Sequence, residues 1–394
     1  MFQARNVTKV FDLSAGRARE VLNGASNRRR AVREAGGVLA VDDVSFDVER
    51  GELFVIMGLS GSGKSTLIRM VNRLVEPTAG RILYDGTDIA DLDEAQLREL
   101  RNKRLSMVFQ HFALFPHRTI RDNAAYGLKT RGVPKNERLE RAERALHQVG
   151  LGQWGDAYPD ELSGGMKQRV GLARALATDP DVLIMDEPFS ALDPLNRRAM
   201  QEQLLELQAE FHKTILFVTH DLNEAMRIGD RIMVMRDGSV VQLGTGPEII
   251  SRPADDYVHD FVSDVDRSRA LTASTVMTAP WLTATLDDDA ASVLAKLERS
   301  TAKGLYVLDP NRRVVGVASV EGLSRAAADG ERDLRRCLDT DYTWVAEETS
   351  LAQCCRLTNR GVVPLAVLDA DKHLVGVVPK TEMLRAIATQ EEGD

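Results

Sequence analysis

Short runs of apolar and β-branched residues alternate with helical patterns and turn signals through the first two thirds of the chain. Apolar runs also flank the dipeptides Asp85-Gly86 and Asp237-Gly238, which is typical of hairpin turns. Strands that alternate with helices predict an α/β domain built on a mainly parallel sheet. The clearest predicted strands are Leu53–Met57, Val182–Met185, Thr214–Thr219 and Arg231–Met235.

The last third of the chain contains an internal repeat. The segment from Tyr306 to Val317 matches the segment from Ala366 to Val377, which begins 60 residues later. Each copy predicts two strands joined by a polar turn and followed by a helix. A small α/β unit that is duplicated once is expected to pair its copies across a shared interface. The predicted domains are 1–268, 272–330 and 331–390.

Composition and charge narrow the class of protein. Hydrophobic residues make up 43% of the 394 residues and charged residues 28%, the balance of a soluble globular protein. No apolar run approaches the roughly 20 residues that span a bilayer, and the N-terminus lacks the apolar core of a signal peptide. A net charge of −8 disfavours nucleic acid as a partner. We therefore expect a cytosolic chain that does not bind nucleic acid.

A basic segment, residues 17–34, interrupts the alternation of strands and helices. The simplest interpretation is a solvated insertion. The alternative is a surface that meets a partner or anionic lipid headgroups, because clustered arginines attract anions. The segment contains two glutamates and six arginines: Arg17, Arg19, Arg28, Arg29, Arg30 and Arg33.

Residues 58–66 read GLSGSGKST and fit the pattern GxxxxGK[ST]. The segment follows the strand Leu53–Met57 and precedes a helical run, Thr66–Leu74, which is the context that the pattern requires. Glycines let backbone N–H groups turn inward around phosphates, and the helix N-terminus adds favourable partial charge. Lys64 is expected to reach the β- and γ-phosphates of ATP, and the Ser65 hydroxyl to ligate Mg²⁺.

Two carboxylates, Asp186 and Glu187, follow the apolar run Val182–Met185. Open α/β sheets bind ligands at the C-terminal ends of their strands, so the pair is expected beside the phosphate loop. Asp186 can hold Mg²⁺, and Glu187 can polarise the attacking water as a general base. The alternative is a purely structural role, in which the acidic pair caps the next helix. That role is less favoured because the same chain also contains a phosphate loop.

The run LSGGMKQR, which begins at Leu162, resembles the signature sequence of ABC ATPases. A helix that starts at Ser163 would present its hydroxyl and the backbone of Gly164 and Gly165 to an anion. The resemblance implies a P-loop NTPase fold with a RecA-like core and a helical subdomain at about 111–180. In this family the segment binds the γ-phosphate of ATP held by a second subunit, which implies two copies facing head to tail.

Other positions also resemble family motifs. Gln110 matches the glutamine that senses Mg²⁺ and the γ-phosphate, Asp193 lies in a segment similar to the D-loop, and His220 matches the switch histidine. Phe11 is the best candidate for stacking on adenine, with a core position as the alternative, because the family usually has tyrosine there.

The resemblance then assigns roles to individual residues. The catalytic residues are Glu187, His220, Lys64 and Gln110. The Mg²⁺ ligands are Ser65, Gln110 and Asp186. The ATP contacts are Phe11, Gly58, Ser60, Gly61, Ser62, Gly63, Lys64, Ser65, Thr66, Gln110, Ser163, Gly164, Gly165, Gln168, Asp186, Asp193 and His220.

Nearly the whole chain resembles the ATPase subunits of glycine betaine/proline uptake systems, the quaternary-amine importers. Besides the basic insertion, the resemblance rests on FVIMGLS from Phe54, FALFPH from Phe112, YPDELS from Tyr158 and DLNEAMRIGD from Asp221. It implies two copies of the chain on a multispanning permease at the cytoplasmic face of the inner membrane. It also implies a solute-binding protein, separate or fused to the permease. The aromatics after Gln110 are expected to face the permease, unless they form a local core.

The internal repeat resembles a tandem pair of cystathionine-β-synthase-type (CBS) regulatory domains. Such pairs often bind adenosine nucleotides through a Ser/Thr and an Asp that follow a glycine strand. This chain has Ser319 and Gly322 at those places in the first copy, and Pro379 and Glu382 in the second. A nucleotide ligand, a dinucleotide at the dimer interface, a purely structural role and a response to ionic strength therefore all stay open. The response to ionic strength would act through screening of surface charge.

Other functions remain as alternatives to quaternary-amine import. One is the ATPase of another small-solute importer. A soluble ABC ATPase acting on nucleic acid or ribosomes usually has two ATPase domains or a long coiled-coil insertion, and the sequence predicts neither. A nucleotide-binding regulatory module without turnover is disfavoured because Glu187 and His220 are both present.

Overall fold

The computed structural model describes residues 1–108, 114–190, 192–263, 265–358 and 363–388. The chain divides into two compact units, Met1–Val262 and Ser263–Asp394. Each unit has its own sheets and its own core, so each is described separately. Among the described residues, no helix combines the length and the apolar character needed to cross a bilayer.

Unit 1 contains two sheets within its described residues. The smaller sheet is antiparallel and has the order β2-β1-β4-β5. The larger has the order β10-β9-β3-β8-β7-β6, and all its neighbours are parallel except the hairpin β9–β10. The mainly parallel sheet predicted from the sequence is thus confirmed. The strands are β1 Phe2–Phe11, β2 Val38–Val48, β3 Leu53–Met57, β4 Ala79–Tyr84, β5 Thr87–Asp88, β6 Leu105–Val108, β7 Val182–Asp186, β8 Thr214–Thr219, β9 Arg231–Arg236 and β10 Ser239–Gly244.

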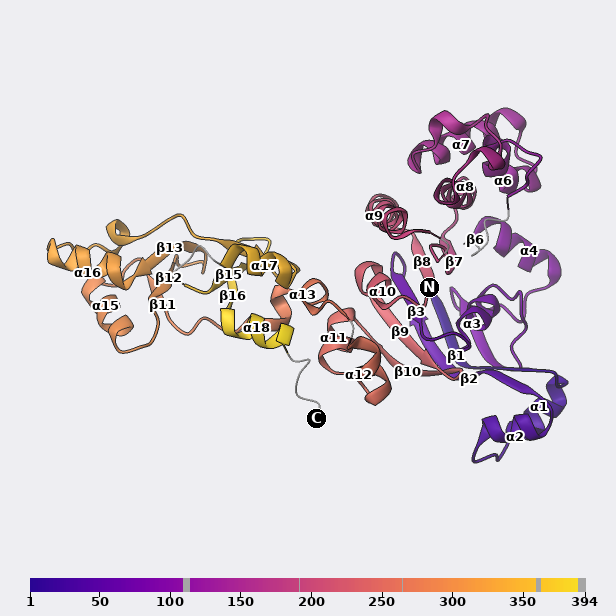
Figure 1. Cartoon of the computed structure of the whole chain (residues 1–394), viewed down its shortest axis with the longest axis horizontal. Coiled ribbons are helices and arrows are strands. Elements are labelled where there is room, and N and C mark those ends of the chain that lie inside the picture. Colours follow the sequence, from indigo (N-terminus) through magenta and orange to yellow (C-terminus); the bar gives the residue numbers. More distant parts are fainter. Residues whose placement is uncertain (109–113, 191, 264, 359–362, 389–394) are drawn as a thin grey trace. The chain divides into compact units, whose positions relative to one another are not determined.

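Helices cover the larger sheet and also form a separate group. Figure 1 shows α6, α7 and α8 lying together as one group. The separate group comprises α5 Ile120–Ala124, α6 Tyr126–Thr130, α7 Lys135–Gln148, η1 Gly152–Trp154, η2 Pro159–Glu161 and α8 Gly164–Leu176. The other helices are α3 Lys64–Val71, α4 Glu94–Lys103, α9 Pro194–Phe211, α10 Leu222–Ile228, α11 Gly246–Ser251 and α12 Asp256–Val262.

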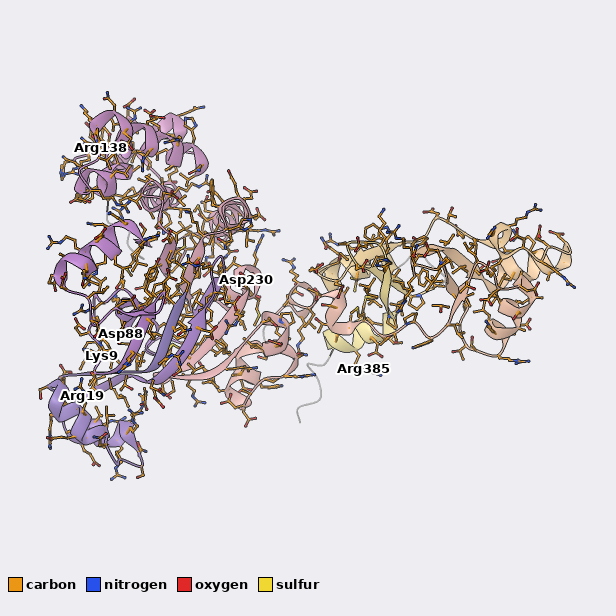
Figure 2. All side chains as sticks on the ribbon, turned by 180° about the vertical axis from the view of Figure 1, so that it is seen from behind. Lys9, Arg19, Asp88, Arg138, Asp230 and Arg385 are labelled. Carbon is orange, nitrogen blue, oxygen red and sulfur yellow. The ribbon has the colours of Figure 1, made fainter. Side chains whose placement is uncertain are left out.

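The central strands of the larger sheet are buried on both faces, which explains their unbroken apolar runs. Every residue of β3 and of β8 is buried. Phe54 of β3 stacks on Phe46 of β2 with ring centroids 5.3 Å apart, so one core joins the two sheets. At the start of β3, Asp230 accepts a hydrogen bond of 2.8 Å from the Leu53 N–H; Asp230 is labelled in Figure 2.

The basic insertion is folded, but most of its residues are exposed, so both the solvated insertion and the binding surface stay open as interpretations. It forms two helices, α1 Ala15–Leu22 and α2 Arg28–Glu34. Ala18 and Val32 are fully buried, in a small apolar cluster with residues of β1 and β2. Spacing along two short helices places apolar side chains on the inner face while the arginines stay outside.

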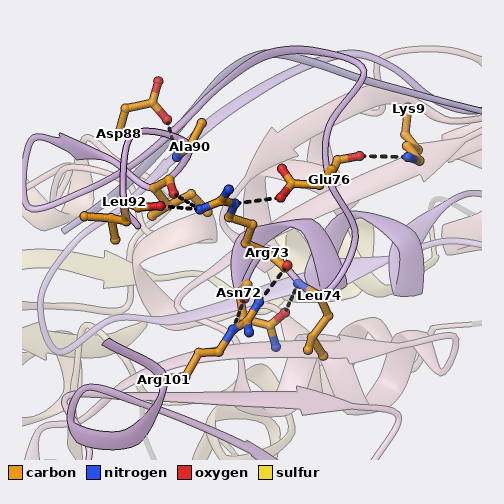
Figure 3. Close-up of polar contacts among 10 residues, drawn as sticks. Lys9, Asn72, Arg73, Leu74, Glu76, Asp88, Ala90, Leu92 and Arg101 are labelled. Carbon is orange, nitrogen blue, oxygen red and sulfur yellow. Dashed lines mark hydrogen bonds and ion pairs between the residues drawn. The ribbon is translucent and has the colours of Figure 1, made fainter. Parts of the chain in front are cut away.

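The helix that follows the phosphate loop, α3, is anchored at its C-terminal end (Figure 3). The Arg101 side chain of α4 donates to the carbonyl oxygens of Asn72 at 2.9 Å and Arg73 at 2.7 Å. The Arg73 side chain in turn donates to the carbonyl oxygens of Ile89 at 3.1 Å and Leu92 at 2.7 Å. The two Arg101 bonds satisfy carbonyl groups at the end of α3, where a helix lacks intrahelical partners, and the Arg73 bonds tie this end to the loop before α4. The helix begins two residues earlier than the predicted Thr66–Leu74, because Gly63 precedes its first turn. It ends three residues earlier, with Asn72 as its C-cap.

Unit 2 contains two three-stranded sheets of the same topology, β11-β12-β13 and β14-β15-β16. Tyr306 pairs with Val317 in the first sheet and Ala366 with Val377 in the second, so the 60-residue offset of the repeat is confirmed. These four side chains also share one buried cluster, which confirms the predicted interface between the copies. The strands are β11 Thr283–Thr285, β12 Gly304–Leu308, β13 Val314–Ser319, β14 Trp344–Ala346, β15 Leu365–Leu368 and β16 Leu374–Val378. The helices are α13 Arg267–Ala270, α14 Ala273–Val276, α15 Ala290–Glu298, α16 Val320–Ala328, η3 Leu334–Cys337, α17 Leu351–Leu357 and α18 Lys380–Ala388.

Replacing the anchor of α3 should destabilise unit 1. Arg101→Met removes two hydrogen bonds from a cationic donor and should lower the unfolding free energy by about 1–3 kcal/mol. The measurement is thermal unfolding of the full chain. Arg98→Gln is the control, because Arg98 lies on the exposed face of α4, the helix that also carries Arg101. It should leave the melting temperature unchanged. Equal melting temperatures for the two variants would show that Arg101 does not hold α3.

Candidate active site

The phosphate loop lies between β3 and α3, where the sequence predicts it. Its three glycines have φ angles that side chains rarely adopt: +148° at Gly58, +81° at Gly61 and +93° at Gly63. Gly63 is also the residue that precedes the first turn of α3. This conformation turns backbone N–H groups toward the space at the helix N-terminus, which is the arrangement that binds phosphate.

The wall behind the loop leaves no room for side chains at two of these glycines. A Cβ atom on Gly58 would lie 2.2 Å from the Met235 carbonyl oxygen, and one on Gly63 would lie 2.3 Å from the Ala40 carbonyl oxygen. The loop is therefore pressed against the end of β9 and the start of β2. The Gly238 N–H also donates to the Ser62 carbonyl oxygen at 3.1 Å, which fixes the loop to the β9–β10 turn.

Lys64 occupies the centre of this loop and is only 5% exposed. Its Nζ donates to the carbonyl oxygens of Gly58 at 2.8 Å and Leu59 at 3.0 Å. Burial lowers the pKa of the ammonium group, and the negative charges of Glu187 and Asp186 act in the opposite direction. A buried cation that is held by two neutral carbonyls is poised to accept an anion, because a phosphate would offset the cost of its burial.

The oxygen atoms expected to hold Mg²⁺ lie together. The Ser65 hydroxyl donates to Asp186 Oδ1 at 2.8 Å, and Asp186 is 5% exposed. The other oxygen, Asp186 Oδ2, lies 3.5 Å from the Arg69 guanidinium. A hydroxyl and a carboxylate are ligands that Mg²⁺ prefers, and Mg²⁺ usually takes its remaining ligands from phosphates and water. The donor set therefore fits the ion.

Arg69 is a residue of this site that the sequence analysis missed. It comes four residues after Ser65 on α3, so both side chains lie on one face of the helix. The four-residue spacing from Ser65 is the feature of the sequence that could have indicated Arg69 as a residue of the site. Ser62, which was predicted to contact ATP, has a buried hydroxyl oxygen. Among the described residues this oxygen has no hydrogen-bond partner. An unpaired hydroxyl inside a phosphate loop is consistent with a ligand that completes its hydrogen bonding.

Glu187 and His220 meet at the ends of neighbouring strands, β7 and β8. Glu187 Oε2 lies 3.0 Å from His220 Nδ1, and the glutamate side chain is 18% exposed. The Glu187 backbone has φ +47°, held by the Val218 carbonyl oxygen on its N–H and by the Ser190 hydroxyl on its carbonyl oxygen. Strained backbone that is fixed from both sides sets the direction of a side chain, as functional sites require.

The signature segment lies at the N-terminus of the 13-residue helix α8. Ser163 and Gly164 are exposed there, and the Ser163 hydroxyl accepts a hydrogen bond from the Met166 N–H at 3.3 Å. The expected helix start is thus confirmed. Gln168 differs from its neighbours because it is 1% exposed, so its side chain lies inside the helical group rather than on the surface that Ser163 presents.

The remaining residues that were predicted to contact ATP differ in their exposure and in the elements that carry them. Asp193 precedes α9 and is exposed, and the hydrogen bond from the Asn196 side chain lowers its pKa. Phe11 ends β1 and is 37% exposed, and its ring centroid lies 4.9 Å from Lys9 Nζ. Ser60 is exposed on the phosphate loop, and Thr66 is half-buried in the first turn of α3. Gln110, the aromatic Phe112 and the D-loop residue Ala191 lie outside the described residues.

In unit 2 the positions expected to hold a nucleotide are already paired. Ser319 precedes α16, and its hydroxyl accepts the Gly322 N–H at 3.0 Å. The Glu382 carboxylate pairs with Arg385 at 3.2 Å; Arg385 is labelled in Figure 2. A cavity of about 60 Å³ lies between the copies, and its lining includes Tyr306, Tyr342, Asp339 and Asp341. This cavity is too small for a nucleotide and carries carboxylates that would repel phosphate.

The close approach of the phosphate loop to the backbone behind it can be tested by a matched pair of substitutions. Gly58→Ala places a Cβ against the Met235 carbonyl oxygen and should weaken ATP binding more than about tenfold, since the loop must shift. Gly86→Ala is the control, because Gly86 also has positive φ, +81°, but open space around it. It should cost about 1–2 kcal/mol of stability and leave ATP binding unchanged. Equal ATP affinities in a binding titration of the two variants would contradict the close approach.

Comparison with known proteins agrees with this geometry. The family model described as ABC transporter matches residues 41–190, and the CBS domain model matches residues 273–329 and 332–389. The glycine betaine/carnitine transport ATP-binding protein of Listeria monocytogenes is 46% identical over 99% of this chain and 98% of its own length. The glycine betaine transport ATP-binding protein of Bacillus subtilis is 45% identical over 99% of this chain and 93% of its own length.

A solved structure supports the fold of unit 1. It is a dimeric ATP-binding cassette in a post-hydrolysis state, bound to ADP and phosphate. It is 32% identical, has a TM-score of 0.53, and covers 62% of this chain and 98% of its own chain. The curated relatives extend this likeness along nearly the whole chain, including the CBS pair. The chain therefore belongs to the family of ABC transporter ATP-binding proteins that includes the glycine betaine transport ATP-binding proteins.

Proposed function

We propose that the chain is the ATP-hydrolysing subunit of an importer for a quaternary amine such as glycine betaine. The observation that carries the proposal is the assembled site, in which Lys64, Asp186 and the Glu187–His220 pair lie at one edge of the sheet. The substrate class comes from two similar proteins, which are named for the transport of glycine betaine and, in one case, also of carnitine. The chain itself contributes the ATP chemistry and not the recognition of the amine.

The proposed chemistry assigns one task to each group. Lys64 binds the β- and γ-phosphates of ATP, and the Ser65 and Asp186 oxygens hold Mg²⁺ together with Gln110. When bound, Mg²⁺ neutralises charge on the transferring phosphoryl group. Glu187 orients the attacking water and accepts its proton, and His220 holds the Glu187 carboxylate through the 3.0 Å contact. Phosphoryl transfer needs this positioning more than it needs covalent chemistry.

We further propose that the complete site forms between two copies of the chain. Ser163 belongs to α8 in the helical group, and it is exposed at the N-terminus of a helix long enough to carry a dipole. Such a terminus suits the γ-phosphate of ATP held by a second subunit. The similar cassette is dimeric with ADP and phosphate bound, which supports the arrangement. Asp193 precedes α9 and is assigned to the same interface.

Phe11 is proposed to stack on the adenine ring. It pairs with Val38 of β2, two residues before Ala40, whose carbonyl oxygen lies against the phosphate loop. An exposed ring at that distance along the strand suits the base of a nucleotide whose phosphates occupy the loop. The lysine 4.9 Å away adds a cation beside the ring.

The membrane partner is proposed to be a multispanning permease at the cytoplasmic face of the inner membrane, served by a solute-binding protein. A groove of about 330 Å³ separates the helical group from the sheet, and its lining includes Phe115, Tyr126, Arg131 and Arg174. Its lining includes Met107, which comes three residues before Gln110 in the sequence, so an element bound there could respond to the nucleotide. Aromatic and arginine side chains are the residues that interfaces favour.

The CBS pair is proposed to regulate transport with osmotic conditions. A nucleotide ligand of the pair stays a prediction, and the pairing of Glu382 with Arg385 disfavours a site within one copy. A ligand at an interface between two pairs, or a direct response to ionic strength, fits the described unit better.

The shared site can be tested by distributing two lesions between subunits. Lys64→Ala in one chain and Ser163→Arg in the other leave one complete site if the subunits face head to tail. ATP turnover of that mixed dimer should reach up to about half of the wild-type rate, while each homodimer is inactive. Uptake of labelled glycine betaine by vesicles carrying the chain with its permease should follow the same order.

The control carries both lesions in one chain, paired with a wild-type chain. Head-to-tail assembly then breaks both sites, so this dimer should be inactive. If the control is active and the first mixed dimer is not, each subunit encloses its own ATP and the shared site is wrong. ATP turnover without uptake in the complete complex would leave the ATPase intact but contradict its role in import.

A further inference from the structure

Helix α2 of the basic insertion is joined by ion pairs to the backbone that stands behind the phosphate loop. The helix lies against β2 (Figure 1), and it begins with Arg28 and Arg29. Arg28 pairs with Asp42, a residue of β2. Arg29 pairs with Asp237 in the turn between β9 and β10. One short helix thus holds two segments that are far apart in the chain.

The pair between Arg28 and Asp42 is short and partly buried. A guanidinium nitrogen lies 2.6 Å from Asp42 Oδ1, and the two side chains are 29% and 21% exposed. The Oδ1 atom itself is buried, and no hydrogen bond from the described residues reaches it. Among those residues, Arg28 is the one cation that forms an ion pair with this carboxylate. Removing the partner of a buried charge leaves its desolvation uncompensated, so Asp42 depends on Arg28 for its position.

Hydrogen bonds connect Asp42 to the phosphate loop. The Asp42 N–H donates to the Gly238 carbonyl oxygen at 2.8 Å, and the Ser239 hydroxyl donates to the Asp42 carbonyl oxygen at 3.5 Å. The Gly238 N–H in turn donates to the Ser62 carbonyl oxygen at 3.1 Å. One ion pair and two backbone hydrogen bonds therefore lead from Arg28 to the loop that is expected to bind phosphate.

The backbone segments along this route are in close contact. A Cβ atom on Gly63 would lie 2.3 Å from the Ala40 carbonyl oxygen, and one on Gly238 would lie 2.8 Å from the same atom. Ala40 comes two residues before Asp42 on β2. Closely packed segments transmit a displacement instead of absorbing it, so the position of β2 determines where the phosphate loop can lie.

Arg29 holds the other segment, the β9–β10 turn. Its guanidinium donates to the Asp237 carbonyl oxygen and lies 3.7 Å from the Asp237 carboxylate. This pair is more exposed, at 42% and 69%, and Arg236 lies 3.8 Å from the same carboxylate. Exposed ion pairs contribute little, so we expect a smaller effect from Arg29 than from Arg28.

We propose that Arg28 is a positioning residue of the ATP site. Through Asp42 it holds β2 and the β9–β10 turn against the phosphate loop, and Arg29 supports the same turn. The proposal rests on the proposed ATP site, but it gives the basic insertion a task inside the chain. Because the chemical step uses neither arginine, the affinity for ATP should change while the turnover rate at saturating ATP stays unchanged.

The test compares variants of the full chain. Arg28→Met removes the cation, and the double variant Arg28→Met/Asp42→Asn also removes the carboxylate that would lack a partner. Arg29→Gln acts on the turn alone. Arg30→Gln is the control, because Arg30 is an arginine of the same helix whose ion pair, with Glu34, lies within that helix. ATP affinity, turnover rate, melting temperature and amide hydrogen exchange without ATP are measured for each.

Arg28→Met should bind ATP about tenfold more weakly, because the unpaired Asp42 carboxylate moves toward water and draws β2 with it. The amides of Asp42 and Gly238 should exchange faster, since their hydrogen bonds lie on the route to the loop. The double variant should recover ATP affinity to within about threefold of the wild type, because it leaves no unpaired charge. Arg29→Gln should weaken binding about twofold, as for an exposed pair, and Arg30→Gln should change nothing.

Unchanged ATP affinity and unchanged amide exchange in Arg28→Met would overturn the positioning role. Equally weak binding in the double variant would overturn it too, because the loss would then not come from the unpaired charge. If Arg28→Met fails to fold, Arg29→Gln and the double variant decide, and wild-type affinity and exchange in Arg29→Gln would count against the proposal. A wild-type chain that does not bind ATP would contradict the proposed function itself, so the two failures are distinguishable.

Discussion

The structure depends on keeping a charged lysine buried next to two carboxylates until a phosphate arrives. Lys64 is 5% exposed and is held by two carbonyl oxygens of its own loop, while Asp186 and Glu187 supply the opposing negative charge. Burial of a charge is tolerated only where such partners are fixed. The close wall behind Gly58 and Gly63, the anchored C-terminal end of α3 and the strained backbone of Glu187 all serve to fix them.

Much of this arrangement could be predicted from the sequence, because the chemistry occupies contiguous motifs. The phosphate loop, the acidic pair and the Ser163 turn each combine a residue pattern with a strand or helix end, and the structure contains each element where the pattern indicates. The 60-residue repeat was equally visible, since two strands and a turn recur in register. The likeness to ABC transporter ATP-binding proteins then follows from several motifs in one order.

What the sequence could not predict were the contacts made across the fold. Nothing in the run that contains Met235 and Gly238 shows that this turn forms the wall of the phosphate loop, because the two segments are far apart in the chain. The burial of Gln168 depends on how α8 packs within the helical group. The small core beneath the insertion was not predicted either, because arginines dominate the composition of the segment while only a few of its positions are apolar.

The two units differ in how far their residues explain their roles. In unit 1 the roles proposed for Lys64, Asp186 and the Glu187–His220 pair correspond to atoms at stated distances, so substitutions can be chosen with matched controls. In unit 2 the described cavity is small and acidic, and the second copy's carboxylate is already paired.

The central claim is that two copies of this chain close around shared ATP. The most direct measurement is an experimental structure of the Glu187→Gln chain, trapped with ATP and Mg²⁺ in complex with its permease. The account predicts that Lys64 of one subunit and Ser163 of the partner subunit lie within about 3 Å of oxygens on the same γ-phosphate. A structure in which one subunit alone encloses each ATP, with both Ser163 hydroxyls far from phosphate, would contradict it.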